Sequence, residues 1–240
     1  MKILVLVLFS VIGSSIGSEL EKCYIAKCYD LSPVEDLRPI RYTPNRDQLA
    51  MMCPRAVKYA NCIFDEIKLC SGKTLEEMAT SSNEEDSMTA SLLLSAASYA
   101  LDLCNEKSSL HKEYSENVDC YLKYLEDMHK GKCKEDAEKT VTTFLESNPL
   151  SEEEPNFDLM WAGQRCLVKA YRQACVSLQL EESCGDVSRK TYLSIIGRIK
   201  PWLGQECFME NFSMLKNQFL DYLNLEEATK NKYRFAFDAV

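Results

Sequence analysis

Glycine and histidine are scarce in this chain. Among 240 residues there are 8 glycines and 2 histidines, and two of the glycines, Gly13 and Gly17, lie in an apolar N-terminal stretch. So few turn-forming residues argue against the many tight hairpins of a β-sandwich or a β-barrel. The sequence therefore predicts an all-α fold.

Catalytic motifs are missing as well. A nucleophile activated by histidine would have to use His111 or His129, and both stand among polar residues, where solvated surface side chains are expected. The sequence contains no H-E-x-x-H, phosphate-binding loop, dinucleotide fingerprint or EF-hand loop. One match to the G-x-S-x-G nucleophile elbow falls at residues 13–17, in the apolar N-terminal stretch, and is interpreted as a coincidence. We therefore expect that the protein is not an enzyme, with no catalytic residue and no cofactor.

Basic residues are outnumbered by acidic ones, 28 against 37, for a formal net charge of -9. This balance disfavours nucleic acid or an anionic membrane surface as a partner. Adjacent acids at residues 83–86 and 151–154 could hold Ca²⁺, but such runs are usually solvated loops or helix starts. Zinc is disfavoured because the closest cysteines, Cys23 and Cys28, lack a matching second pair. No metal site is predicted.

Long apolar runs are limited to the N-terminus. Lys2 is followed by the run ILVLVLFSVIG, and charge resumes at Glu19. Because a membrane span needs about 20 apolar residues, the run is interpreted as a signal peptide, residues 1–17, cleaved after Gly17. No later run approaches that length, so we predict no membrane span. The mature protein is expected to be secreted and extracellular.

Cysteine, in contrast, is abundant. An even number of cysteines in a secreted chain indicates disulfides. Each bond commonly contributes about 2 to 4 kcal/mol, and because a chain of this length could bury a core without staples, the bonds are interpreted as a device for durability. Their connectivity stays open, since pairing inside each half still allows about 15 arrangements. The cysteines expected in disulfides are Cys23, Cys28, Cys53, Cys62, Cys70, Cys104, Cys120, Cys133, Cys166, Cys175, Cys184 and Cys207.

Two stretches, residues 53–72 and 166–185, share a cysteine spacing. Each holds three cysteines eight or nine residues apart and ends in a glycine. At about 100° per residue a separation of nine places two thiols on opposite sides of a helix. Each stretch is therefore predicted to be a central helix that is tied to more than one neighbour. Gly72 and Gly185 are expected to end these helices in the left-handed conformation.

The recurrence predicts a disulfide-stapled helical bundle of two tandem related modules. The modules are residues 18–115 and 116–240, each with six cysteines. The alternative is one larger helical domain whose cysteine spacing recurs by accident of helix length.

Periodicity and capping residues place the individual helices. Pro54 either kinks the first of them or sits in the first turn of a helix that begins near Cys53. Thr74–Glu77 is a possible capping box for a short helix, and Ser87 and Asn224 are expected to cap later ones. The other predicted helices span residues 47–69, 87–104, 115–129, 134–145, 157–182, 188–200, 205–223 and 225–237.

One N-glycosylation sequon is present, at Asn211-Phe-Ser213. Asn211 follows Cys207 by four residues, so on a continuous helix the two share a face. A bonded cysteine would turn that face inward. Glycosylation of Asn211 and an unused, packed asparagine are therefore both left open.

An apolar stretch rich in alanine, serine and leucine runs through residues 92–103. It predicts a closely packed central helix. As the alternative, its small side chains could line an apolar cavity for a lipid or odorant-like ligand, and aromatic residues of the second half carry the same two interpretations. The candidate lining residues are Leu92, Leu93, Ala96, Tyr99, Leu103, Trp161, Trp202 and Phe208.

The cysteine pattern resembles a group of secreted proteins. Its frame runs C-x4-C, a long arm, then C-x8-C-x7-C, at Cys23, Cys28, Cys53, Cys62 and Cys70. In this it is similar to the uncharacterised, all-helical, cysteine-rich secreted proteins of arthropods and nematodes. The resemblance implies a protein of haemolymph, venom, saliva or a secretory gland.

Two functions are expected from the sequence. In the first, the protein is secreted and non-catalytic, and acts on another extracellular protein through its surface or as a structural constituent of a secretion. In the second, it carries a small hydrophobic ligand in a cavity between helices. A fluorescent apolar probe would bind stoichiometrically to the second and not to the first.

Overall fold

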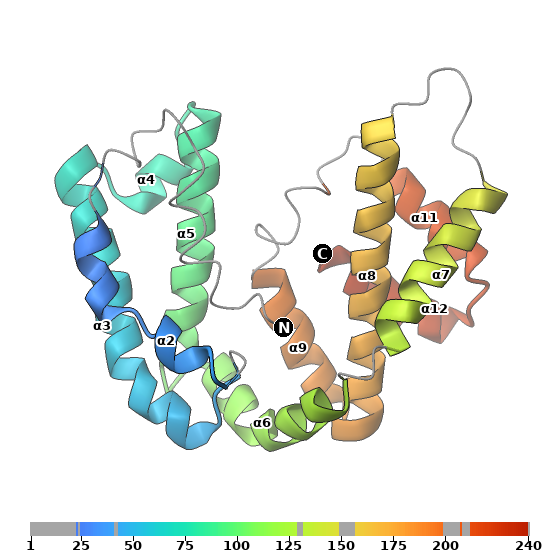
Figure 1. Cartoon of the computed structure of the whole chain (residues 1–240), viewed down its shortest axis with the longest axis horizontal. Helices are drawn as coiled ribbons and strands as arrows, with labels where there is room; N and C mark the ends of the chain where they lie inside the picture. The colour runs from blue at the N-terminus through green and yellow to red at the C-terminus, as the bar shows by residue number, and fades with distance from the viewer. Residues whose placement is uncertain are drawn as a thin grey trace. The chain divides into compact units, whose positions relative to one another are not determined.

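Helices make up the regular structure of the chain (Figure 1). The computed structural model describes residues 23, 25–40, 43–128, 132–148, 157–198, 207 and 212–239, and no strand occurs among them. The predicted all-α fold stapled by disulfides is thus confirmed. The predicted signal peptide lies outside the described residues.

The chain divides into two compact units, which we call unit 1 (Met1–Asp119) and unit 2 (Cys120–Val240). The boundary lies inside one helix, α6 (Ser109–Met128). The sequence placed a module boundary a few residues earlier, between residues 115 and 116. Each unit is described below by itself.

The longest helix of unit 1 is α3 (Arg46–Ser71). Its first turn is closed by a capping box in which Asn45 Oδ1 accepts a hydrogen bond from the backbone N–H of Gln48 and Gln48 Oε1 accepts one from that of Asn45, each at 2.9 Å. The helix runs through Pro54, so the alternative of a start beside this proline is wrong. Gly72 ends α3 with φ of +70°, the left-handed conformation predicted for it.

Three short elements surround α3. The 3-10 helix η3 (Ile25–Leu31) and the helix α2 (Val34–Leu37) precede it, and α4 (Leu75–Ala79) follows it. The capping box predicted for α4 is present. Thr74 Oγ1 accepts a hydrogen bond from the backbone N–H of Glu77 at 3.2 Å, and the carboxylate of Glu77 accepts one from the backbone N–H of Thr74 at 2.7 Å. Local sequence therefore sets the start of α4.

The last helix that belongs wholly to unit 1 is α5 (Glu84–Leu103). It begins at Asn83, whose Oδ1 accepts from the backbone N–H of Asp86 at 3.2 Å. The expectation that Ser87 caps this helix is wrong. Ser87 lies one turn inside α5, where its hydroxyl donates to the carbonyl oxygen of Ala79 at 2.6 Å. The hydroxyl thereby ties α5 to the end of α4.

The core of unit 1 joins η3, α3, α4 and α5. On α3 the apolar face repeats at Tyr59, Ile63 and Ile67, which are at most 2% exposed and fall one helical turn apart. Each such side chain contributes about 1.5 to 3 kcal/mol by leaving water. The buried members of this core are Cys23, Cys28, Tyr59, Ile63, Ile67, Leu75, Met78, Ala90 and Leu93.

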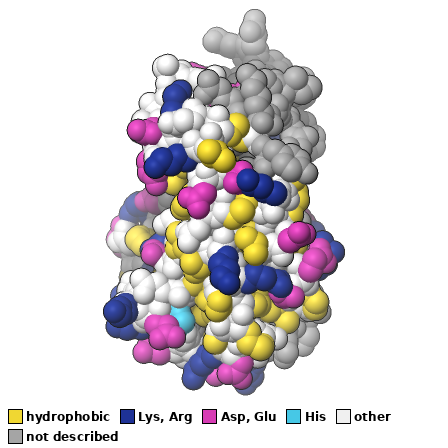
Figure 2. Space-filling view, turned by 90° about the vertical axis from the view of Figure 1, so that its left-hand side faces the viewer, with side chains coloured by type: hydrophobic (Ala, Val, Ile, Leu, Met, Phe, Trp, Pro, Cys, Tyr) yellow, Lys and Arg dark blue, Asp and Glu magenta, His cyan; other side chains and the backbone are white. Residues whose placement is uncertain are grey.

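The surface of unit 1 mixes apolar and charged side chains (Figure 2). The most exposed large apolar residues on α3 are Met51 at 73% and Leu69 at 77%. They lie at opposite ends of the helix, with charged residues between them. Single exposed apolar side chains of this kind are common on protein surfaces.

Helix α6 begins six residues before the predicted start at residue 115. Ser108 Oγ accepts a hydrogen bond from the backbone N–H of His111 at 3.0 Å and so caps the first turn of the helix. The expectation of a solvated His111 is wrong. The ring is half-buried, and its Nδ1 lies 2.7 Å from the carbonyl oxygen of Leu103 at the end of α5. His129 lies outside the described residues.

Unit 2 is built around its longest helix, α8 (Phe157–Cys184). Figure 1 shows α9 (Asp186–Arg198) on one side of α8, α7 (Lys132–Ser147) and α11 (Phe212–Tyr222) on the other, and α12 (Glu227–Asp238) crossing behind α8. The predicted helices of this half agree with α7, α8 and α9 to within two residues at each end. The helix expected at residues 205–223 is described only from residue 212 onward.

Two turns of unit 2 use the left-handed conformation. Gly185 has φ of +87° and closes α8 as predicted, with its N–H donating to the carbonyl oxygen of Glu181 at 2.9 Å. Asn224 has φ of +45°, a conformation that asparagine tolerates better than most residues. The expectation that Asn224 caps α12 is wrong, because the N-cap is Glu226 and makes no side-chain capping bond.

Aromatic side chains fill the core of unit 2. Phe219 of α11 lies at its centre, with its ring 5.1 Å from that of Phe144 and 5.9 Å from that of Tyr171 in edge-to-face geometry. Tyr233 and Phe237 of α12 complete the cluster, at 5.6 Å from Tyr171 and 6.0 Å from Phe219. These spacings lie in the range of about 4.5 to 7 Å that aromatic pairs prefer. They bind α11 and α12 to α7 and α8.

Candidate functional site

All twelve cysteines are paired, in six disulfides. In unit 1, α3 is bonded to Cys23 ahead of η3, to η3 itself and to Cys104 directly after α5. In unit 2, α8 is bonded to α6, to α7 and to Cys207 ahead of α11. The thiols of each central helix therefore reach more than one neighbouring segment, as predicted. The bonds are Cys23–Cys70, Cys28–Cys62, Cys53–Cys104, Cys120–Cys184, Cys133–Cys175 and Cys166–Cys207.

The two units share one order of pairing. When the six cysteines of each unit are counted along the chain, the first is bonded to the fifth, the second to the fourth and the third to the sixth in both. Six cysteines can pair in about 15 ways. The sequence spacing alone did not distinguish among them.

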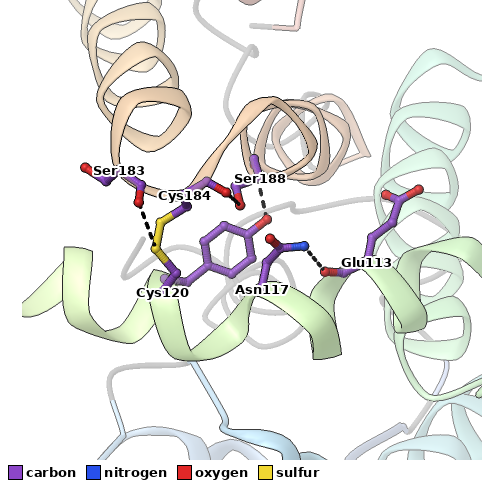
Figure 3. The surroundings of a disulfide bond; sticks show 7 residues. Glu113, Asn117, Cys120, Ser183, Cys184 and Ser188 are labelled. Carbon is purple, nitrogen blue, oxygen red and sulfur yellow. Dashed lines mark hydrogen bonds between the residues drawn. A yellow bond between two sulfur atoms is a disulfide. The ribbon is translucent and has the colours of Figure 1, made fainter.

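Figure 3 shows how one of these bonds fastens the turn between α8 and α9. Cys120 is bonded to Cys184, and its sulfur lies 3.6 Å from the carbonyl oxygen of Ser183. The hydroxyl of Tyr121 donates a hydrogen bond to the carbonyl oxygen of Ser188 at 3.1 Å. The hydroxyl of Ser188 in turn donates to the carbonyl oxygen of Cys184 at 2.9 Å. The first residues of unit 2 in α6 are thereby held to both helices.

An apolar cavity of about 70 Å³ lies inside unit 1 between α3 and α5. Alanines create the space, because short side chains of the two helices face each other there. Pro33, Leu37 and Pro44, from the segment that precedes α3, cover one side, and the disulfide Cys53–Cys104 lies in the wall. The lining alanines are Ala56, Ala60, Ala96, Ala97 and Ala100.

Only some of the residues predicted to line a cavity lie at the cavity of unit 1. Ala96, Tyr99 and Leu103 line it, because they recur at helical spacing on the face of α5 that looks toward α3. Leu92 and Leu93 are buried but do not line it, and Leu93 packs in the main core of unit 1. Trp202, Phe208 and Asn211 lie outside the described residues, and the same holds for the side chain of Trp161.

The cavity adjoins a surface groove of about 420 Å³. Met52 lines both, so its side chain lies between the cavity and the groove. The α3 side of the groove is formed by Gln48, Met51, Met52 and Arg55, and the facing side by Asp36 and Ile40. Positions 48, 51, 52 and 55 form one stripe on the helix. This periodicity is the one feature of the sequence that points to the groove.

The guanidinium of Arg55 is the main cationic group of the groove. Its Nη2 forms an ion pair with the carboxylate of Asp36, and the two side chains are 39% and 49% exposed, so solvent screens the pair. Arg55 Nε is buried, and among the described residues it has no hydrogen-bond acceptor. Arg55 therefore carries one buried donor without an acceptor next to the groove.

The cavity itself carries no charge that changes near neutral pH. Tyr59 lines it, and burial, followed by the charge of Tyr29, raises the pKa of Tyr59 above its ordinary value of 10.0. The phenol is therefore neutral under physiological conditions. The cavity can hold an apolar group but offers no acid or base for catalysis.

In the part of the chain that the structure describes, no group of three or more His, Cys, Asp or Glu side chains is placed to hold a metal ion. None of the described helices is both long and apolar enough to cross a membrane. Comparison of the chain with protein-family models, curated proteins and solved structures found no match. The chemistry of the cavity and groove is therefore the basis for assigning a function.

Proposed function

We propose that the protein is a secreted, non-catalytic carrier that binds a small apolar ligand in the cavity of unit 1. The apolar, alanine-lined space between α3 and α5 is the observation that supports this assignment. Apolar cavities bind apolar molecules because such ligands recover the contacts that the empty space forfeits. Secretion is supported by the six disulfides, which persist in oxidising compartments.

The size of the cavity limits the ligand. Its volume of about 70 Å³ is about half that of an engineered cavity of about 150 Å³ that binds benzene. A short aliphatic chain fits such a space, whereas a bulky ring system does not. A ligand longer than the cavity would extend past Met52 into the groove.

The two units are best explained as copies of one ancestral module, as the cysteine spacing predicts. The shared order of disulfide pairing supports this interpretation, since two unrelated frames would agree in about 1 case in 15. Only unit 1 is assigned the carrier role. In unit 2, Leu167, Ala170 and Ala174 of α8 are fully buried and aromatic side chains fill the core.

Action on another extracellular protein, the other function expected from the sequence, stays a prediction. The two most exposed large apolar side chains of α3, Met51 and Leu69, lie at opposite ends of the helix and do not form one patch, which is too little to define an interface. The cavity is the more specific feature.

Calorimetric titration with hexan-1-ol tests the carrier role. Each buried methylene group contributes about 0.8 kcal/mol, so a chain that places about three of them in the cavity is expected to bind with a dissociation constant of about 20 mM. One site per chain is expected. Ala96→Leu or Ala60→Leu should fill the cavity and abolish binding, whereas Ala50→Leu, at an exposed position of α3, should not. Absence of binding to the native protein, or equal binding to the filled variants, would contradict the proposal.

A further inference from the structure

We propose that the ligand is an aliphatic monocarboxylate, with its apolar chain in the cavity and its carboxylate on Arg55 in the groove. This inference rests on the proposed carrier function and adds the chemical class of the head group. It joins two features that share Met52 in their walls: an apolar space of about 70 Å³ and a polar-edged groove of about 420 Å³.

The first step is the position of the head group. A chain longer than the cavity can continue past Met52 into the groove, because this side chain lines both spaces. Met51, Met52 and Ile40 keep the beginning of that path apolar. The polar groups that line the groove are Asp36, Gln48 and Arg55. One of these three side chains therefore receives the head group.

The second step is the choice of an acceptor as the head group. Among the residues described, the buried Nε of Arg55 has no acceptor, and a buried donor left in that state costs about 1 to 3 kcal/mol. A guanidinium presents its donors in a planar fork that matches the two oxygens of a carboxylate. A ligand carboxylate in the groove can take the terminal nitrogens of Arg55, and it reaches the buried Nε as well once the side chain turns toward the groove. The present partner of Arg55, the carboxylate of Asp36, is paired through Nη2.

The third step concerns Asp36. It lies on α2, a helix of 4 residues, and its side chain is 49% exposed. A ligand carboxylate therefore competes with a partly solvated pair, which is worth little. If the ligand displaces Asp36, one carboxylate replaces another on the same cation and the charge of the groove is conserved once the freed carboxylate enters water.

Binding of hexanoate and of hexan-1-ol, measured side by side at pH 7, tests the head group. The two molecules have the same chain length and differ in the terminal group, and the acid is ionised at this pH because carboxyl pKa values lie near about 4. Native protein should bind hexanoate about tenfold more tightly than the alcohol, since hydrogen bonds to charged groups have at least that effect on affinity.

Three variants locate the effect. Arg55→Gln should lose the preference for hexanoate and leave the affinity for hexan-1-ol within about twofold, and Arg55→Lys should retain part of the preference because it keeps the charge but not the fork. Asp36→Asn should strengthen hexanoate binding by removing the competitor. Arg38→Gln is the matched control, because Arg38 pairs with Glu35 on the same segment and does not line the groove.

The outcomes separate the head-group inference from the carrier function. If the alcohol binds but hexanoate has no advantage, or if Arg55→Gln and Arg55→Lys keep the advantage, the carboxylate assignment is overturned while the carrier role stands. If hexylamine binds more tightly than either and Asp36→Asn abolishes that preference, the head group is a cation on Asp36 and the inference is wrong. If none of the three molecules binds, the carrier role itself fails.

Discussion

Arg189 of α9 and Glu181 of α8 form an ion pair across the turn between the two helices, with 3.1 Å between Nε and the carboxylate. The side chains are 10% and 24% exposed, so the pair is largely withdrawn from water. Lys232 of α12 binds the other oxygen of Glu181 at 2.5 Å, and Asp186 lies 3.1 Å from the guanidinium of Arg189. The network joins three helices of unit 2.

Replacement of Arg189 by methionine should lower the free energy of unfolding of the protein by about 3 kcal/mol, because removing one member of a buried pair leaves the other without full compensation. Urea denaturation followed by circular dichroism measures this change. Lys190→Met is the control, since Lys190 is 64% exposed in its pair with Asp186 and its loss should cost less than about 1 kcal/mol. Equal effects of the two variants would show that burial of Arg189 has no energetic consequence.

The stability of unit 2 should depend on pH through Asp186. Hydrogen bonds from Lys190 and then from Arg189 hold the pKa of Asp186 below its ordinary value of 3.8. The unfolded chain therefore takes up the proton first as the pH falls, so the interaction stabilises the fold above about pH 4 and its contribution is lost below that value.

Asp186→Asn should therefore reduce the loss of stability between pH 6 and pH 3, measured by urea denaturation at both values. Asp65→Asn, at an exposed position of α3, serves as the comparison. An unchanged pH dependence in Asp186→Asn would mean that Asp186 does not contribute to acid sensitivity.

The disulfide Cys53–Cys104 should support both stability and ligand binding. It closes a loop of 51 residues, for which the loss of unfolded-state entropy amounts to about 4 kcal/mol. Both cysteines also line the cavity. The double variant Cys53→Ala/Cys104→Ala should therefore lower the melting temperature and weaken hexan-1-ol binding.

The corresponding bond of unit 2, Cys166–Cys207, provides a matched control with a sequence separation of 41. Its removal should lower stability by a similar amount and leave ligand affinity unchanged, because the cavity is lined by residues of unit 1. Loss of binding in the unit 2 variant would contradict the assignment of the site to unit 1.

The features that sequence predicted well are those set by local chemistry. The capping box of Thr74 and Glu77 and the left-handed glycines at Gly72 and Gly185 depend on a few adjacent residues. The cap of α5 was predicted wrongly. Asn83 caps this helix and Ser87 does not, because the hydroxyl of Ser87 donates to the carbonyl oxygen of Ala79 in another helix, a contact that depends on tertiary structure.

The candidate site was only partly predictable for a related reason. Ala96, Tyr99 and Leu103 were identified because they lie on one apolar helix. The facing alanines, Ala56 and Ala60, sit four residues apart on α3 and could have been found by their spacing. The groove could not, because Arg55 and Asp36 come together only when α2 folds back onto α3.

The most direct measurement of the central claim is a nuclear magnetic resonance titration of the alanine methyl groups with hexan-1-ol. The methyl signals of Ala56, Ala60 and Ala96, which line the cavity, should shift in proportion to one bound molecule. Those of Ala170 and Ala174, buried in unit 2, should stay in place. Shifts confined to unit 2, or no shifts at saturating alcohol, would contradict the assignment of the cavity as a ligand site.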